Sequence, residues 1–587
     1  MNAPLEVWAP RAERVDVVID DEPHPLTPTA EGWWRWAAGV PAGTDYAFSL
    51  DGGSARPDPR SPWQPHGVHG VSRTFDVRAH RWSDGDWPGR DVRDAVLYEL
   101  HVGTFTAGGT LDDAAERLEH LARLGVTMIE LMPVAAFNGR HGWGYDGVAL
   151  YAVHEEYGGP AALQRFVDAA HRAGIAVCLD VVYNHLGPSG NYLAEFGPYF
   201  TQAHSTPWGA AVNLDGAGSA EVRAFVVENA LRWLRDFHVD ALRLDAVHAL
   251  VDDSPVHLLA ELSARVAALA VELDRPLSLV AESDLNDARM VTPVVDGGLG
   301  MTAQWDDDVH HALHALLTGE RHGYYVDFGA SSTFRKAVED VFVHDGAYST
   351  FRGRAWGAPV PADVDGHRFV AFSANHDQVG NRALGDRPGR TLDAAALAAA
   401  AALVLWSPFV PMLFMGEEWG ASTPWLYFTD HPEAELGAAV TAGRAREFGT
   451  HGWADLYGDG TLTVPDPQDP ATFAASRLDW AEPGHGEHAR LLAWHRDVIA
   501  LRAATPDLAS GDRSATRVEH ADDGAWLVLY RGSHAVVVAR TDSPASVPVA
   551  GAGELVLAWD PPSTVVSSDA VALPGRGTAL VRRSGHR

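Results

Sequence analysis

Residues 175–185 read IAVCLDVVYNH, residues 240–247 read DALRLDAV and residues 277–283 read LSLVAES. Each stretch is an apolar run of strand length that carries ionisable or polar residues toward its carboxyl end, and helical stretches separate the three. An apolar run of this kind is typical of a strand that is buried on both faces of a parallel sheet. These stretches therefore predict successive βα units of one sheet.

Five further runs of the same kind extend the pattern over residues 95 to about 503. They are VLYELHV (96–102), VTMIELMPV (126–134), MTAQWD (301–306), FVAFSANHD (369–377) and PMLFMGEE (411–418). Eight strands that alternate with helices predict an α/β fold, a (β/α)8 TIM barrel. A doubly wound sheet is the alternative, but it would need a glycine-rich phosphate turn that the sequence lacks.

The regions on either side of the barrel have short alternating runs broken by turn residues, which are typical of antiparallel strands. We therefore expect an N-terminal β-sandwich over 1–90, a catalytic barrel over 91–507 and an antiparallel β-domain over 508–587. Within the barrel, we expect insertions at about 186–217 and about 419–485, after the third and eighth strands. Both insertions leave from strand carboxyl ends, where barrel enzymes build their sites.

Composition excludes several classes of function. The chain has 78 acidic and 45 basic residues and a formal net charge of −33, with no basic block, so nucleic acid and anionic membranes are not expected partners. The single lysine, Lys336, lies in neither a phosphate-binding loop nor a Schiff-base context. The single cysteine, Cys178, lies in an apolar run and is predicted to be a core thiol.

No stretch near the N-terminus has the basic and apolar regions of a signal peptide. No later stretch contains roughly 18 uninterrupted apolar residues. From these two observations we expect a soluble, cytoplasmic protein.

Ionisable residues at the strand ends indicate where the chemistry lies. Asp180 and His185, Arg243 and Asp245, Glu282, and His376 and Asp377 lie at or just after the carboxyl ends of four predicted strands and should converge on the barrel mouth. Any one of these residues could be structural. Together they favour catalysis, because no structural need brings several mutually repelling carboxylates to one place.

The residue types fit the two roles in a retaining glycosidase. The two-residue period of a strand places Arg243 and Asp245 on one face, so the guanidinium can keep Asp245 ionised, as a nucleophile requires. Glu282 ends an apolar run, where burial and nearby negative charge should raise its pKa, as a general acid requires. Adjacent strands lie about 4.8 Å apart, which allows the carboxyl separation of about 5 to 5.5 Å found in retaining enzymes.

Four motifs carry a resemblance to a known family. DVVYNH (180–185), LRLDAVH (242–248), AES (281–283) and ANHD (374–377) resemble, in order and spacing, the four sequence regions of the α-amylase superfamily, glycoside hydrolase family 13. The resemblance implies that Asp245 is the nucleophile and Glu282 the acid/base, and that Asp377 holds sugar hydroxyls.

The same resemblance implies a set of substrate-binding residues in the cleavage subsite. Tyr145, in HGWGYDGV, corresponds to an aromatic residue that stacks under the sugar. Tyr145, His185, Arg243, His376, Trp305 and Asp306 are the predicted substrate-binding residues, of which the last two end the sixth predicted strand.

Within the superfamily, the chain is most similar to the maltooligosyltrehalose trehalohydrolase family. The matching stretches include PDPRSPWQPHGVHG (57–70), QWDDDVHHALHALLTGERHGYYVDFG (304–329) and YFTDHPEAELGAAVTAGRAREF (427–448). The resemblance implies hydrolysis of the α-1,4 bond next to the terminal trehalose unit of maltooligosyltrehalose, with release of trehalose and a maltooligosaccharide. It also implies functional pairing with a maltooligosyltrehalose synthase.

Two alternatives stay open. A glycogen-branching or other transglycosylating enzyme would share the three carboxylates and differ in the acceptor of the sugar. A non-catalytic glycan-binding scaffold would be marked by loss of one of the three, and all are present.

No cofactor or metal is predicted. His310 and His314 have the i, i+4 spacing of metal ligands, but no third ligand accompanies them. Asn184 falls where some amylases bind calcium, yet the insertion that follows offers no oxygen-rich cage.

Overall fold

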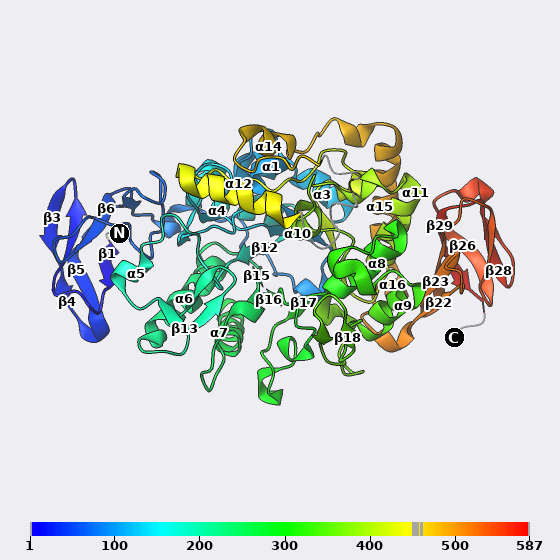
Figure 1. Ribbon diagram of the computed structural model, residues 1–587, viewed down its shortest axis with the longest axis horizontal. Helices are drawn as coiled ribbons and strands as arrows, with labels where there is room; N and C mark the ends of the chain where they lie inside the picture. Colours follow the sequence, from blue (N-terminus) through cyan, green and yellow to red (C-terminus); the bar gives the residue numbers. More distant parts are fainter. Residues whose placement is uncertain (1–2, 449–456, 458–461, 585–587) are drawn as a thin grey trace.

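The computed structural model describes residues 3–448, 457 and 462–584. Eight strands, which are parallel in every neighbouring pair, form a closed barrel at its centre, so the predicted α/β barrel is confirmed (Figure 1). In chain order they are β8 (Leu97–Leu100), β9 (Met128–Leu131), β12 (Ala176–Val181), β15 (Ala241–Leu244), β16 (Ser278–Ala281), β17 (Ala303–Trp305), β20 (Phe369–Phe372) and β21 (Val410–Phe414). The last strand pairs with the first, which closes the ring.

Helices connect these strands and surround the barrel. The principal ones are α3 (Leu118–Leu124), α4 (Gly159–Arg172), α6 (Ser219–Asp236), α7 (Leu258–Leu273), α8 (Asp307–Thr318), α9 (Ser331–Asp340), α11 (Ala394–Leu405) and α15 (Gly486–Ala504). Helix α6 shows why they pack there: Val222, Phe225, Val226 and Trp233 recur at helical spacing and are buried.

The barrel interior has an apolar layer and a polar layer, which follow from the two-residue period of the strands. Leu97, Met128 and Cys178 belong to the apolar layer, and Cys178 is buried as predicted. Two residues further along each strand, on the same inward face, lie the buried acids Glu99, Glu130 and Asp180. The change from apolar to ionisable residues therefore coincides with the end of the barrel where the strands finish.

The N-terminal region forms two antiparallel sheets at one end of the long axis of the molecule (Figure 1). The sheets are β1-β5-β4 and β3-β2-β6-β7, with β1 (Ala3–Trp8), β2 (Val15–Ile19), β3 (Glu22–Pro25), β4 (Thr27–Pro28), β5 (Trp33–Val40), β6 (Asp45–Leu50) and β7 (Ser72–Arg73). Two hydrogen bonds reach from this region to the barrel region. Arg56 donates to Glu195 at 2.8 Å, and Trp33 donates to Glu221 at 3.1 Å. These contacts fasten the N-terminal sheets to the barrel.

The segment between these sheets and the barrel is fastened to the barrel's outer helices by a buried charge cluster. His171 of α4 lies between two carboxylates, with its Nδ1 at 2.9 Å from Asp84 and its Nε2 at 2.9 Å from Asp240. The ring of Trp87 stacks on His171 at 4.6 Å between ring centres, and its Nε1 donates to Asp240. We call Asp84, Trp87, His171 and Asp240 the linker latch.

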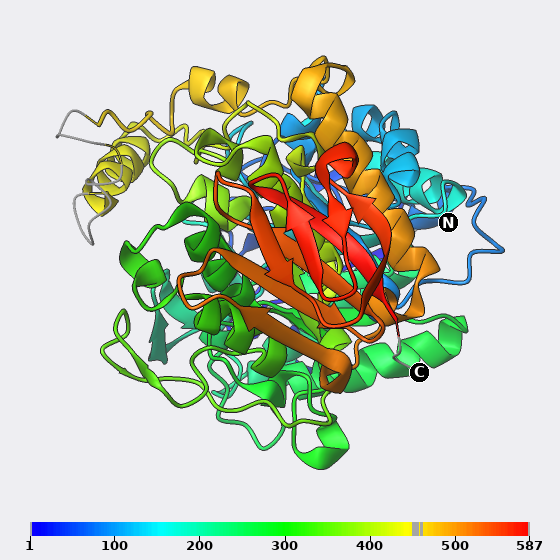
Figure 2. The same ribbon diagram turned by 90° about the vertical axis from the view of Figure 1, so that its right-hand side faces the viewer.

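The C-terminal region forms two further antiparallel sheets at the opposite end, which face the viewer in Figure 2. The sheets are β22-β23-β24-β29-β26 and β25-β28-β27, with β22 (Thr516–His520), β23 (Trp526–Arg531), β24 (His534–Ala539), β25 (Ala545–Pro548), β26 (Ala552–Ala558), β27 (Val565–Val566), β28 (Ala570–Leu573) and β29 (Gly577–Arg583). Strand β22 contacts α9, which carries Lys336, whose Nζ is paired with Asp345 at 2.5 Å. The expected boundaries near residues 90 and 508 stay a prediction.

Two inserted segments lie over the carboxyl end of the barrel. The segment after β12 contains α5 (Leu193–Phe196) and the hairpin β13 (Phe200–Thr206) and β14 (Gly209–Val212). The segment after β21 contains α12 (Ala434–Glu447) and α14 (Pro470–Ala475), and its residues 449–456 and 458–461 lie outside the described part. Among the described residues, no helix is both long and apolar enough to cross a membrane.

Candidate active site

A cavity of about 480 Å³ opens where the barrel strands end. It is lined by Trp143, Tyr145, Asp146, His185, Trp208, Asp245, Ala246, His248, Glu282, His376, Asp377, Asn381, Tyr427 and Thr429. Asp245 follows β15, Glu282 follows β16, and Asp377 lies in α10 (His376–Gly380), just after β20. The structure therefore brings together the three carboxylates that the sequence placed at strand ends.

One buried guanidinium organises the carboxylates. Nη1 of Arg243 donates to Asp245 at 2.9 Å and to Asp180 at 2.8 Å, and Nη2 lies 3.4 Å from Glu282. The Arg243 side chain is fully buried, so water screens these interactions little. This geometry fixes the orientation of Asp245.

Asp180 is the deepest of these acids and does not line the cavity. It accepts from the Tyr145 hydroxyl at 2.7 Å as well as from Arg243. Burial raises the pKa of Asp180 to about 7, although Arg243 opposes the shift. Asp180 thus links the aromatic wall of the cavity to the central arginine.

Glu282 has the environment of a proton donor. Burial raises its pKa, Arg243 opposes the shift, and the negative charges of Asp245 and Asp377 reinforce it. The backbone N–H of Ala246 donates to its carboxyl at 2.5 Å. Ala246 has a φ of 38°, a left-handed conformation that is uncommon for alanine and turns this N–H toward Glu282.

His376 connects Asp377 to the barrel interior. Its Nδ1 lies 2.5 Å from Glu99 Oε1, its backbone N–H donates to Glu99 Oε2 at 2.8 Å, and its Nε2 lies 3.5 Å from Asp377. Burial disfavours the imidazolium, but Asp377 and Glu99 outweigh it and raise the pKa of His376 to about 9. The ring of Tyr145 stacks on His376 with 5.0 Å between ring centres. A cationic His376 can therefore donate to groups at the cavity floor.

The rim of the cavity is aromatic on one side. His185 bonds the backbone oxygen of Tyr145 at 3.0 Å and stacks on Trp208, with ring centres 4.5 Å apart. Trp208 lies between β13 and β14 and is 49% exposed. An exposed flat ring beside the carboxylates suits the apolar face of a sugar.

Three predicted substrate-binding residues do not line the cavity: Arg243, which is fully buried, Trp305 and Asp306. Trp305 is 2% exposed and packs on the guanidinium of Arg243, inside the barrel. Asp306 is 1% exposed, and its side chain accepts from the backbone N–H of Asp308 at the start of α8. Trp305 and Asp306 lie at the correct end of the barrel, but both side chains are buried within the protein.

Other wall residues were not predicted as site residues. Asp146, His248, Asn381, Tyr427 and Thr429 come from loops and short helices rather than from strands. Asn381 donates to Asp377 at 3.2 Å, one helical turn further along the chain. Only its i, i+4 spacing from Asp377 could have indicated it.

The described residues give little support for a metal centre. His310 bonds Ser373 and Tyr325, and His314 bonds Glu320, each at 2.9 to 3.0 Å. His204, Asp215 and Asp253 come close enough to share an ion, but His204 and the backbone of Asp253 already bond Asp215. We assign no metal to either group.

A closed (β/α)8 barrel with three carboxylates at its mouth, two of them held by one buried arginine, defines a glycoside hydrolase of the α-amylase class. The alpha-amylase catalytic domain family matches residues 76–205. The chain belongs to the malto-oligosyltrehalose trehalohydrolase family. It is 52% identical to the malto-oligosyltrehalose trehalohydrolase of Arthrobacter ramosus, over 99% of this chain and 100% of that one.

Two further comparisons agree with this assignment. The chain is 48% identical to the malto-oligosyltrehalose trehalohydrolase of Mycobacterium tuberculosis, over 98% of this chain and 99% of that one. A crystal structure of a Salmonella typhimurium protein assigned to the alpha amylases superposes with a TM-score of 0.89 at 35% identity, covering 99% of this chain and 97% of that one. The likeness therefore includes both terminal β-regions as well as the barrel.

Proposed function

We propose that the protein hydrolyses the α-1,4-glucosidic bond next to the terminal trehalose unit of maltooligosyltrehalose, releasing trehalose and a maltooligosaccharide. Full-length similarity to proteins of that name supports the substrate. The cavity supports a neutral glucan, since the described residues of its wall offer aromatic rings and hydrogen-bonding groups and include no lysine or arginine.

The reaction proceeds by double displacement. Asp245 attacks the anomeric carbon while Glu282 donates its proton to the leaving glycosidic oxygen, which gives a covalent glycosyl-enzyme. Glu282, now ionised, removes a proton from water, which attacks the same carbon and releases Asp245. Asp377 and His376 bind sugar hydroxyls, Tyr145 stacks on the ring, and Arg243 and His185 support the same subsite.

The observation that carries this mechanism is that Asp245 and Glu282 contact one guanidinium at the cavity. Arg243 lies 2.9 Å from Asp245 and 3.4 Å from Glu282, and Glu282 has a raised pKa because of desolvation and the nearby carboxylates. A retaining glycosidase needs two neighbouring carboxyls, one that attacks and one that donates a proton.

Product analysis tests the proposal. Purified wild type, Asp245→Asn and Glu282→Gln are incubated with maltooligosyltrehalose, with maltopentaose and amylose as control substrates. We expect free trehalose from the wild type, little cleavage of the controls and a loss of at least about 10³-fold in each variant. Proton NMR at early times should show the new reducing end as the α-anomer, because the configuration is retained.

Other outcomes would reassign the protein. Branched or elongated glucans would indicate a transglycosylating enzyme, which resolves the same intermediate with a sugar hydroxyl. Binding of glucans without turnover would indicate a scaffold. A β-anomeric product would exclude Asp245 as a nucleophile and indicate inversion.

We also infer that the substrate is made by a maltooligosyltrehalose synthase in the same cytoplasmic compartment. A glucan with a terminal trehalose unit must come from an enzyme that rearranges the reducing end of a maltooligosaccharide. Release of trehalose from plain maltooligosaccharides, only when both enzymes are present, would support this pairing.

A further inference from the structure

The turn that presents His376 and Asp377 begins at Ser373, directly after β20. Inside the barrel, Glu99 holds His376 through both its backbone N–H and its ring. Above the turn, Trp425 Nε1 donates to the His376 oxygen at 3.0 Å. Asp377 is 41% exposed, and its own contacts are Asn381 and His376, so its position depends on how the turn is held.

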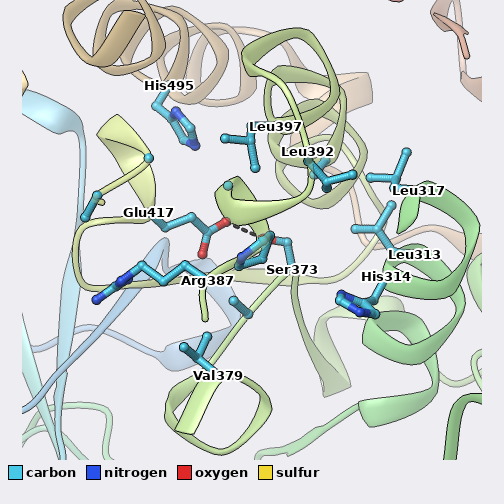
Figure 3. A pocket seen from close by; sticks show the side chains of 16 residues that line it. Leu313, His314, Leu317, Ser373, Val379, Arg387, Leu392, Leu397, Glu417 and His495 are labelled. Atoms are coloured by element: carbon cyan, nitrogen blue, oxygen red, sulfur yellow. Dashed lines mark hydrogen bonds between the residues drawn. The ribbon is translucent and has the colours of Figure 1, made fainter. Parts of the chain in front are cut away.

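On the outer side of the barrel, the turn is held by Glu417, which follows β21. The Ser373 hydroxyl donates to Glu417 Oε1 at 2.5 Å (Figure 3). The backbone N–H of Phe414 donates to Oε2 at 3.0 Å. The last register pair between β20 and β21 is Phe372 with Met412. The carboxylate of Glu417 therefore links the two strands at the point where their backbone pairing ends.

Glu417 lines a small cavity behind the turn, shown in Figure 3. The cavity measures about 40 Å³, and a bound water needs about 10 to 15 Å³ of such volume. Arg387 and His495 belong to its wall, and Nη2 of Arg387 and Nε2 of His495 have no hydrogen-bond partner among the described residues. The space suits bound water and is too small for a sugar.

Because of the cavity, hydrogen bonds rather than close packing hold the turn on this side. Leu313, Leu392 and Leu397 line it without filling it, so close packing does not fix Ser373 on this side. The restraint comes instead from hydrogen bonds, one from the Ser373 hydroxyl to Glu417 and one from His310 Nδ1 to the Ser373 oxygen at 2.9 Å. Loss of the Glu417 bond would leave the turn room to move outward.

We propose that Glu417 is a positioning residue, which sets the place of Asp377 in the active site by holding Ser373 against the end of β21. Glu417 does not line the active-site cavity and acts only through the turn. The inference rests on the proposed function, because it concerns the same Asp377. It assigns a role to the first glutamate of LFMGEE, which the reaction itself does not use.

Kinetics of Glu417→Gln, Ser373→Ala and the double variant with maltooligosyltrehalose test the proposal. Glutamine keeps the volume but has one acceptor oxygen, so it cannot serve both donors. We expect kcat/KM to fall by about 10- to 100-fold in Glu417→Gln, mainly through kcat, because displaced groups cost most in the transition state. Ser373→Ala should show part of this loss, and the double variant should be no worse than Glu417→Gln.

Leu397→Ala is the matched control, since it enlarges the same cavity without touching the turn. It should lower the melting temperature while leaving kcat and KM of the folded enzyme within about twofold of the wild type. An equal kinetic loss in Leu397→Ala would assign the effect to general loosening and overturn the proposal. Additive losses in the double variant would also overturn it, because the two residues would then act independently.

Crystal structures of the wild type and Glu417→Gln give a readout that does not depend on turnover. We expect the Asp377 carboxylate to move by about 1 Å while Asp245 and Glu282 stay in place. An unmoved Asp377 would overturn the positioning role. If the wild type fails to cleave maltooligosyltrehalose, the proposed function fails, whereas the displacement of Asp377 still decides this inference.

Discussion

The ring of Trp305 lies against the guanidinium of Arg243 inside the barrel, with 4.2 Å between the guanidinium carbon and the ring centre. A cation on the face of an indole is stabilised by the ring's electron density, more so when both are desolvated. Arg243 in turn contacts Asp180, Asp245 and Glu282. Trp305 therefore acts on the carboxylates through the arginine and not through the sugar.

Replacing Trp305 should affect turnover more than binding. In Trp305→Leu the guanidinium loses its flat support, and we expect kcat to fall by about 10- to 100-fold with KM within about threefold of the wild type. Trp305→Phe, which keeps an aromatic face, should retain most of kcat. Steady-state measurements of kcat and KM for both variants test this prediction. A rise in KM alone would instead indicate that Trp305 contacts the substrate directly.

Glu282 should set the alkaline side of the pH profile. Its raised pKa keeps the carboxyl protonated above the usual range of glutamate, so kcat/KM should fall as pH rises through that raised pKa. Glu282→Gln should lose about 10³ to 10⁴ in kcat/KM and should lack this alkaline limb. An unchanged limb in the residual activity of the variant would assign the titration to another group.

The linker latch should contribute to stability in a limited pH window. Burial disfavours the Asp84 carboxylate, but hydrogen bonds from His171 and His238 outweigh burial and lower its pKa. The contribution of Asp84 is therefore complete above the unfolded value, about 3.9, and is lost progressively as pH falls from there through the lowered folded value. His171 has a raised pKa, so its contribution is complete below about 6.5 and is lost as pH rises through the raised value.

Asp84→Asn should lower the free energy of unfolding by about 3 kcal/mol at pH 6, because it leaves a buried imidazolium with one partner fewer. Asp86→Asn, two residues away and exposed, should change it by less than about 0.5 kcal/mol. Urea titrations at several pH values from 6 downward measure both variants. A difference between Asp84→Asn and the wild type that does not shrink as pH falls would show that packing and not charge is responsible.

Trp208 should contribute to binding at the rim. It is 49% exposed and stacks on His185, so Trp208→Ala removes a flat surface without opening the core. We expect KM to rise about 3- to 10-fold with little change in kcat, which corresponds to one aromatic contact. Trp82→Ala, which alters a stacked tryptophan outside the cavity wall, is the control.

Sequence periodicity predicted the barrel because buried parallel strands are nearly continuous apolar runs, and ionisable residues at their ends stand out. Glu99 and Glu130 lie within such runs, and neither was recognised as part of the polar layer, although the two-residue period places them inward. Asp306 was predicted as a substrate contact from the family resemblance, and it follows the end of a strand. Consecutive residues of a strand face opposite sides of the sheet. Trp305 faces the barrel interior, so Asp306, the next residue, points away from the barrel axis.

The cavity rim could not be predicted in the same way. Asp146, Tyr427 and Thr429 are brought to the wall by irregular segments, whose path depends on tertiary contacts and not on a repeating pattern. Trp208 lies in an inserted segment, and its stacking on His185 depends on the hairpin of β13 and β14. Such contacts between distant segments cannot be predicted from a sequence pattern.

The ion pair of Lys336 has a practical consequence for attaching the enzyme to a surface or a dye. Lys336 is the only lysine in the chain, so amine-reactive reagents have one side-chain target besides the N-terminal amine. It lies on α9 beside the C-terminal sheets and outside the cavity wall, so coupling there would leave the cavity wall unmodified. Because its amine is paired with Asp345 and Asp340, acylation should proceed faster at high salt or in Asp345→Asn, which gives control over where and when the molecule is immobilised.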